Sequence, residues 1–193
     1  MNTSNLLASI RKRVSLSEDE AQFFTSLFLP LQVRQGDMIE KVGEHTKYFI
    51  YVVSGCLMSY YTDRDGNDHV MQFSQADWWT GDLTSYSTNV PSTMSTRALA
   101  ETEVLLLPKS GFDELLEKVP KMERYFRILF QNALMNNGNR LMQNFSVTAE
   151  ERYLNFQKKY ATLEQYVPLK YIASYLGITP EFLSKIRRKL TQK

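Results

Sequence analysis

Residues 169–190 read LKYIASYLGITPEFLSKIRRKL, and this stretch decides how the C-terminal end of the chain folds. Ile172 and Leu176 stand four residues apart, which places both on one buried helix face. Ala173 beside them is small enough for a second helix to cross closely. Gly177 can adopt the left-handed conformation that ends many helices. We therefore predict a helix that ends at Gly177 and is followed by a sharp turn.

A second helix is expected directly after this turn. Thr179 can cap it, and Pro180 fits a first turn because the N–H that proline lacks would be unpaired there anyway. Leu183, Ile186 and Leu190 share one face at spacings of three and four residues. Two short helices joined by a glycine turn predict a helix-turn-helix, the unit that places its second helix in the major groove of DNA.

The face of the second helix opposite its core is polar and basic. Lys185 can donate to guanine, Glu181 can accept from cytosine N4, and Ser184 can do either. The neighbouring basic side chains are better placed for phosphates, which hold the register without reading the sequence. The predicted DNA-contacting residues are Lys170, Thr179, Pro180, Glu181, Ser184, Lys185, Arg187, Arg188 and Lys189.

Charge is unevenly spread along the chain. The whole chain carries a net charge of +2, from 23 basic and 21 acidic residues. Residues 169–193 hold six of the basic residues and one of the acidic residues, which leaves 17 basic and 20 acidic residues, a net charge of −3, for the remainder. A basic C-terminal end on an otherwise slightly acidic chain favours a polyanionic partner.

Upstream, residues 31–108 have the pattern of an antiparallel β domain. Short apolar and aromatic runs, such as residues 48–53, are separated by turn signals that contain glycine. Residues 58–62 and 69–73 flank a polar tip and predict a hairpin. Short strands at this spacing are typical of a barrel or jelly roll.

Helical spacing governs the other parts of the chain. Capping boxes are expected at Ser17 and Thr148. The fold class is therefore α+β: an N-terminal antiparallel β-barrel or jelly roll with flanking helices, a long central helix and a C-terminal winged-helix-like helix-turn-helix.

We predict helices at residues 6–28, 112–119, 121–145 and 148–160. We predict a sensor domain at residues 1–120, the central helix at 121–146 and a DNA-binding domain at 147–193.

The central helix is apolar over a wide arc, so more than one side of it should be covered. A second copy of the chain would cover the side that the barrel does not, and burial within one chain is the alternative. Residues 136–138, Asn-Asn-Gly, lower the helix propensity and mark either a kink or a ligand contact. The side chains that we predict at a dimer interface are Phe126, Leu129, Ala133 and Leu141.

Together, the N-terminal helix, small barrel, long central helix and C-terminal helix-turn-helix resemble the CRP/FNR family of regulators. Residues 81–104 resemble that family's phosphate cassette, and residues 171–181 with 151–153 resemble the branch common in Bacteroidetes. The resemblance implies a cytoplasmic homodimer that reads a near-palindromic site on double-stranded DNA, because each subunit supplies one recognition helix. It also allows RNA polymerase as a further partner.

The resemblance further implies a small-molecule site in the cassette. In cyclic-AMP-binding members an arginine–serine pair grips the cyclic phosphate, and the matching pair here is Ser92-Thr93. Two hydroxyls do not replace the charge and the forked geometry of an arginine. We therefore expect no cofactor and no cyclic AMP, and a different effector if the cassette binds one. The expected ligand-contacting residues are Gly81, Asp82, Leu83, Ser92, Thr93 and, on the central helix, Asn137.

Two other classes of protein stay open. One is a sensor module of the same barrel type that acts through protein contacts without specific DNA binding. The other is a cupin-type enzyme, which needs several metal ligands facing into the barrel. His45 and His69 are the only histidines and Cys56 is the only cysteine, too few for such a cluster or for a structural zinc site. We therefore expect no metal and no enzymatic activity, and Cys56 as a small core residue.

Overall fold

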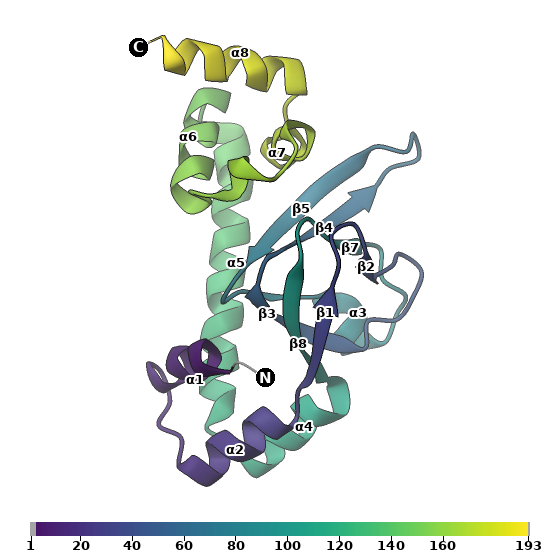
Figure 1. Ribbon diagram of the computed structural model, residues 1–193, viewed down its shortest axis with the longest axis vertical. Helices are drawn as coiled ribbons and strands as arrows, with labels where there is room; N and C mark the ends of the chain where they lie inside the picture. Colours follow the sequence, from purple (N-terminus) through teal and green to yellow (C-terminus); the bar gives the residue numbers. More distant parts are fainter. Residues whose placement is uncertain (1–2, 193) are drawn as a thin grey trace. The chain divides into compact units, whose positions relative to one another are not determined.

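The computed structural model describes residues 3–192 and contains two four-stranded sheets (Figure 1). The strands are β1 (Leu29–Val33), β2 (Met38–Glu40), β3 (Tyr48–Ser54), β4 (Cys56–Thr62), β5 (Asp68–Gln75), β6 (Trp79–Thr80), β7 (Ser95–Ala98) and β8 (Thr102–Pro108). One sheet has the order β1-β8-β3-β6 and the other β2-β7-β4-β5. The pairs β1/β8, β2/β7, β3/β6 and β3/β8 are antiparallel. The predicted β domain and the hairpin of β4 and β5 are therefore confirmed.

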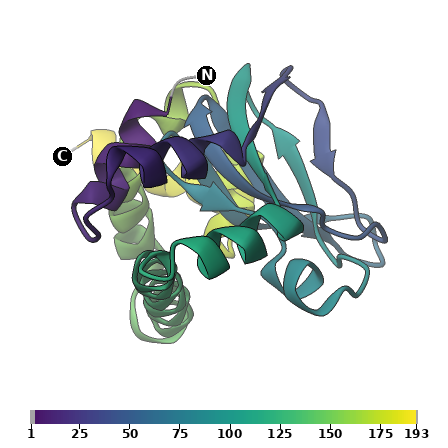
Figure 2. The same ribbon diagram turned by 90° about the horizontal axis from the view of Figure 1, so that it is seen from below.

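Helices precede and follow the strands, and Figure 2 shows α1, α2 and α4 beside the sheets. The helices are α1 (Ser4–Arg11), α2 (Glu18–Ser26), α3 (Leu83–Thr88), α4 (Lys109–Lys118), α5 (Met122–Ser146), α6 (Ala149–Lys159), the 3-10 helix η1 (Leu163–Gln165), α7 (Leu169–Leu176) and α8 (Pro180–Thr191). The long central helix is α5, which agrees with its predicted bounds to within one residue. In the part of the chain that the structure describes, none of these helices has the length and apolar character needed to cross a membrane.

Strand β3 is buried on both faces, and this explains why its sequence is apolar without interruption. Ile50 and Val52 point into the core cluster that also holds residues of β1, β4, β7 and β8. Phe49 and Tyr51 point to the other side, into a cluster built with α1, α2, α4 and the start of α5. Side chains alternate along a strand, so a strand covered on both sides loses the polar alternation of an exposed sheet.

The N-terminal segment differs from the prediction of one helix over residues 6–28. It forms two helices, α1 and α2, and Ser17 starts the second. The Ser17 hydroxyl accepts from the Glu20 N–H at 3.2 Å, and the Glu20 carboxylate accepts from the Ser17 N–H at 2.7 Å. The capping box was correctly predicted from the sequence, but a cap starts a new helix and therefore separates this segment from α1. The second helix ends at Ser26, before Pro30.

Contacts between residues divide the chain into two compact units. The first comprises residues 1–59 and 73–132, and the second comprises residues 60–72 and 133–193. Helix α5 runs unbroken through residues 136–138, so the Asn-Asn-Gly run does not interrupt it. This division falls inside α5 and assigns the hairpin tip to the C-terminal unit.

The C-terminal unit is held by an apolar core from α6, η1, α7 and α8, which includes Phe156, Leu163, Ile172 and Leu183. Thr148 and Glu151 form the predicted capping box at the start of α6. Within residues 147–192 the structure shows helices and no strand, so the wing of the predicted winged helix is absent from these residues. Lys193, counted in the basic C-terminal end, lies outside the described residues.

Candidate nucleic-acid interface

The turn between α7 and α8 has the predicted conformation. Gly177 lies in the left-handed region, with φ +67° and ψ +35°, and ends α7. The Ile178 N–H donates to the Ala173 carbonyl at 3.1 Å, which satisfies a carbonyl at the end of the helix. Ala173 is fully buried and gives α8 room to cross α7. The Thr179 hydroxyl accepts from the Phe182 N–H at 3.2 Å and caps α8.

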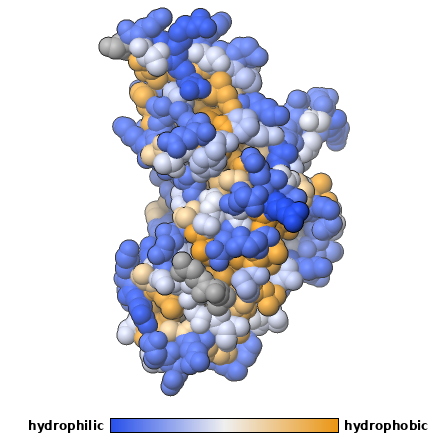
Figure 3. Space-filling view, in the orientation of Figure 1, coloured by the Kyte–Doolittle hydropathy of each residue, from blue (hydrophilic) through white to orange (hydrophobic). Residues whose placement is uncertain are grey.

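One face of α8 is buried and the other is exposed. Leu183 and Ile186 are buried in the core of the C-terminal unit. The opposite face presents Glu181, Lys185 and Arg188 to solvent. Hydrophilic side chains cover the outside of α8 at the top of Figure 3. Side chains at a spacing of three and four residues on a free helix face can reach base edges and phosphates together.

The remaining predicted DNA-contacting residues fall into two groups. Thr179, Pro180 and Arg187 are exposed at or along α8, and Ser184 is exposed but donates to the Pro180 carbonyl at 2.9 Å. Lys170 is exposed at the start of α7, 4.9 Å above the Tyr171 ring.

Lys189 is already engaged within the chain. Its ammonium lies 2.5 Å from a carboxylate oxygen of Glu150 on α6, so this predicted phosphate contact is a link between α6 and α8. No local pattern predicts this pairing, because the two residues are far apart along the chain.

The hairpin tip contacts the helix-turn-helix inside the C-terminal unit, and no sequence signal predicts this contact. The Ser174 hydroxyl of α7 donates to the Asp68 carbonyl at 2.7 Å and accepts from the Val70 N–H at 2.9 Å. Arg140 of α5 donates to the Met71 carbonyl. These bonds tie the edge of the hairpin to α7 and to the second half of α5.

In the first unit, the cassette brings together four of the predicted ligand residues, Gly81, Asp82, Leu83 and Ser92. One carboxylate oxygen of Asp82 caps α3 by accepting from the N–H groups of Thr84 and Ser85 at 3.0 and 3.2 Å. The other accepts from the Ser92 hydroxyl at 2.8 Å. Both oxygens therefore already have partners, and Asp82 and Ser92 hold the cassette together.

The two other predicted ligand residues have different surroundings. Thr93 is exposed beside the buried Ser92. Asn137 is exposed on the part of α5 that belongs to the C-terminal unit, whereas the cassette belongs to the first unit. The six predicted ligand residues are thus divided between two units.

A second carboxylate, Glu40, lies close to the cassette. Its Oε2 accepts from the Thr96 hydroxyl at 2.9 Å, and Thr96 is in turn 2.9 Å from the Ser59 hydroxyl. Its Oε1 is buried without a hydrogen-bond partner among the described residues. Burial raises the pKa of Glu40, and the bond from Thr96 offsets part of this rise. The polar interior is acidic, which disfavours a phosphate.

The four α5 side chains predicted at a dimer interface differ in exposure. Phe126 is 2% exposed and packs in the core of the first unit, so it is unavailable to a partner. Leu129 is half-buried against the same core. Ala133 and Leu141 are exposed. Five large apolar side chains stand exposed on the second half of α5, namely Leu134, Met135, Leu141, Met142 and Phe145.

The remaining single residues do not form a metal centre. His69 lies 2.7 Å from Asp63 in the hairpin tip, and this pairing lowers the pKa of Asp63 to about 2. His45 is exposed and Cys56 is a buried core residue, as predicted. Over residues 3–192, no three His, Cys, Asp or Glu side chains gather into a possible metal site.

Comparison with known proteins shows that the β domain is similar to a described family. Residues 30–119 match the family named "Cyclic nucleotide-binding domain". Over 167 residues the chain is 23% identical to the "Fumarate and nitrate reduction regulatory protein" of Vibrio cholerae. The aligned region covers 80% of this chain and 65% of that protein. The chain thus spans slightly less than two thirds of the length of this curated relative.

Solved structures share the fold. FixK2 from Bradyrhizobium japonicum superposes with a TM-score of 0.74 at 19% identity, over 86% of this chain and 85% of that chain. The catabolite activator protein of Thermus thermophilus superposes with a TM-score of 0.58 at 19% identity, over 92% and 85%. At these identities the likeness establishes the α+β fold with its antiparallel sheets, long helix and C-terminal helices.

The carboxyl of Glu40 gives a stability prediction. The raised pKa means that the folded state favours the protonated form of Glu40. The contribution of Glu40 to the free energy of unfolding is therefore most favourable below pH 4.5, and it is lost as pH rises through the raised pKa. We expect Glu40→Gln, which stays neutral, to raise Tm at pH 7 by about 2–4 °C and to leave it unchanged near pH 4. Thermal melts at both pH values measure this, with surface Glu44→Gln as the control. A lower Tm for Glu40→Gln at pH 7 would contradict it.

Proposed function

We propose that this chain is a CRP/FNR-type transcription regulator with a cyclic nucleotide-binding domain at residues 30–119, and that it binds double-stranded DNA as a homodimer through α7 and α8. The observation that carries the proposal is the two-sided character of α8. Leu183 and Ile186 bury one face of this helix in the core. Glu181, Lys185 and Arg188 are therefore exposed together on the opposite face. A helix of this kind at the second position of a helix-turn-helix fits the major groove.

The roles of the outward side chains follow from their chemistry. Lys185 donates to guanine O6 and N7, and Glu181 accepts from cytosine N4. Arg187 and Arg188 bind phosphates, as does Lys170 at the start of α7. Lys189 is left out of the DNA contacts, because Glu150 pairs with it. A lysine is a compact charge without the fork of arginine, so guanine readout is less geometrically strict.

The dimer is proposed to form along the second half of α5. At about 100° per residue, Leu134, Leu141 and Phe145 share one face of the helix. Leu134 is 74% and Phe145 is 80% exposed, although large apolar side chains in a row are costly in water. A second copy of α5 covers such a row by the isologous packing of a two-fold dimer. Two recognition helices then read half-sites about 34 Å apart on a near-palindromic operator.

The effector and the cellular setting complete the proposal. The cassette supports an effector other than cyclic AMP, since Ser92 and Thr93 stand where the family has an arginine–serine pair and the Ser92 hydroxyl already donates to Asp82. The regulator is cytoplasmic, uses no metal or cofactor, catalyses no reaction and has RNA polymerase as its further partner. Sensor, central-helix and DNA-binding roles are assigned to residues 1–120, 121–146 and 147–193. Residues 171–181 support the branch common in Bacteroidetes, while relatives such as that of Vibrio cholerae are proteobacterial.

Substitution of Lys185 tests the base contact. We expect Lys185→Ala to weaken binding to the preferred operator by about tenfold and to relax the preference at one base pair, because one base contact is lost. The operator is first selected from a random duplex pool with the wild-type protein, and affinities are then measured by fluorescence anisotropy. Arg188→Ala is the matched control, and it should weaken binding to all duplexes alike and reduce the salt dependence. An unchanged base preference in Lys185→Ala would contradict the proposed contact of Lys185 in the major groove. If the wild-type protein shows no salt-dependent DNA binding, the result would favour the alternative function, a sensor module that acts through protein contacts.

Substitution of Leu141 tests the dimer. We expect Leu141→Lys to convert a dimer into a monomer in sedimentation velocity runs at micromolar concentration, because two charges would be buried against each other in the isologous contact. Asn132→Lys, an exposed position on the opposite side of α5, is the control and should leave the dimer intact. An intact dimer in Leu141→Lys would move the interface away from this face.

Cyclic AMP should leave the thermal stability unchanged. A nucleotide at about 100 times its Kd would add about 2.7 kcal/mol, a shift of several degrees for a chain of this length. We expect no shift at millimolar cyclic AMP, because no arginine stands at the phosphate position. A reproducible rise of several degrees would show that the cassette opens and binds the nucleotide.

A further inference from the structure

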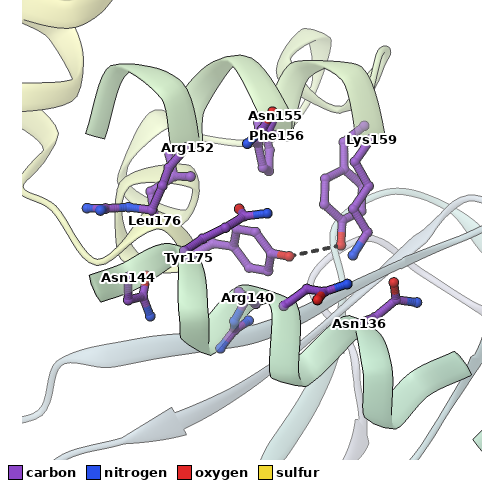
Figure 4. Close-up of a pocket in the computed structure, with 12 residues that line it drawn as sticks. Asn136, Arg140, Asn144, Arg152, Asn155, Phe156, Lys159, Tyr175 and Leu176 are labelled. Atoms are coloured by element: carbon purple, nitrogen blue, oxygen red, sulfur yellow. Dashed lines mark hydrogen bonds between the residues drawn. The ribbon is translucent and has the colours of Figure 1, made fainter. Parts of the chain in front are cut away.

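The C-terminal unit contains a pocket that is separate from the cassette. It lies among α5, α6 and α7 and has a volume of about 170 Å³ (Figure 4). Its cations are Arg140 from α5 and Arg152 and Lys159 from α6, and Tyr175 of α7 points into it. None of the residues that line it carries a carboxylate. Three positive charges without a counter-charge on the walls make the pocket electropositive.

One hydrogen-bond donor in this pocket, the Nε of Arg152, has no partner among the described residues. Arg152 donates from Nη1 to the Val147 carbonyl at 3.0 Å, but its Nε is buried without a partner among the described residues. A buried donor left unpaired is costly, and a bound anion would remove that cost. Side-chain amides, including Asn136, Asn144 and Asn155, line the same space and add further donors.

Aromatic rings hold two of the cations in place. The Arg140 guanidinium lies 4.8 Å from the centre of the Tyr175 ring, and the Lys159 ammonium lies 5.1 Å from that of Tyr160. The hydroxyls of Tyr160 and Tyr175 are 3.5 Å apart, the bond drawn as a dashed line in Figure 4. Cations ordered in advance lose less side-chain entropy when a ligand arrives.

From these contacts we propose that the pocket among α5, α6 and α7 binds a small phosphate-bearing anion. Its volume is below the range of about 300–1,000 Å³ that drug-sized ligands occupy, which favours a compact ligand. Arg152 and Lys159 provide the charge, and the amides provide orientation. The ligand is a small molecule and not the backbone of the DNA, because the outward face of α8 contributes no residue to the lining.

The pocket also stays accessible in the proposed dimer. Asn136 and Gln143 lie on the face of α5 roughly opposite Leu134 and Leu141, at about 100° per residue, and Arg140 lies on the flank between the two faces. A ligand held by α5, α6 and α7 would fix α7 relative to the dimer helix, and α7 leads through Gly177 into the recognition helix. This regulatory consequence rests on the proposed DNA-binding function, whereas anion binding itself does not.

Calorimetric titration with sodium pyrophosphate, at constant ionic strength, tests the site. We expect saturable binding of one pyrophosphate per chain by the wild-type protein and a loss of about tenfold or more in affinity in Lys159→Gln and in Arg152→Gln. Lys158→Gln is the matched control, since Lys158 is the adjacent exposed lysine of α6 and does not line the pocket. Thermal melts of each variant verify that it is folded.

Three results would overturn the proposal: no saturable heat with the wild-type protein, wild-type affinity in both pocket variants, or a loss in Arg188→Gln that matches the loss in Lys159→Gln. The last result would place the anion on the DNA-binding face. The same proteins titrated with the selected operator separate the two proposals. Normal pyrophosphate binding without any operator binding would overturn the DNA-binding function alone.

Discussion

Burial of one helix face fixes what the opposite face presents, and both surfaces proposed to be functional in this chain depend on that constraint. On α8, Leu183 and Ile186 must pack into the C-terminal core, so Lys185 and Arg188 are turned outward. On α5, the first half packs Phe126 into the core of the first unit, whereas the second half leaves Leu134 exposed. Since an α-helix is rigid, packing at one face decides the available chemistry at the other.

Electrostatics assign different ligand chemistry to the two units. Around the cassette, the carboxylates of Asp82 and Glu40 face hydroxyl groups, and no arginine accompanies Ser92. In the C-terminal unit, Arg152 and Lys159 line a pocket without a carboxylate. A phosphate is stabilised by fixed positive charge and disfavoured near buried negative charge. These charges support the proposal of an anionic ligand among α5, α6 and α7 rather than in the β domain, which is similar to the family named "Cyclic nucleotide-binding domain".

Local signals in the sequence predicted local structure well. The capping boxes at Ser17 and Thr148, the β4–β5 hairpin and the turn at Gly177 each depend on a few neighbouring residues, and each is present. The helix over residues 6–28 was wrong, because the cap at Ser17 separates two helices. Phe126 was wrong as an interface residue, because periodicity shows that a helix face is apolar but not which neighbour covers it.

The sequence by itself determined the α+β class, the helix-turn-helix and the exposed basic face of α8, because spacing along a helix or strand fixes which residues share a face. Only the tertiary structure decided the pairing of Lys189 with Glu150, the bonds from Ser174 to the hairpin and the pocket around Arg152. These features join residues that are distant along the chain. Contacts of this kind arise from the packing of whole elements, which no local pattern encodes.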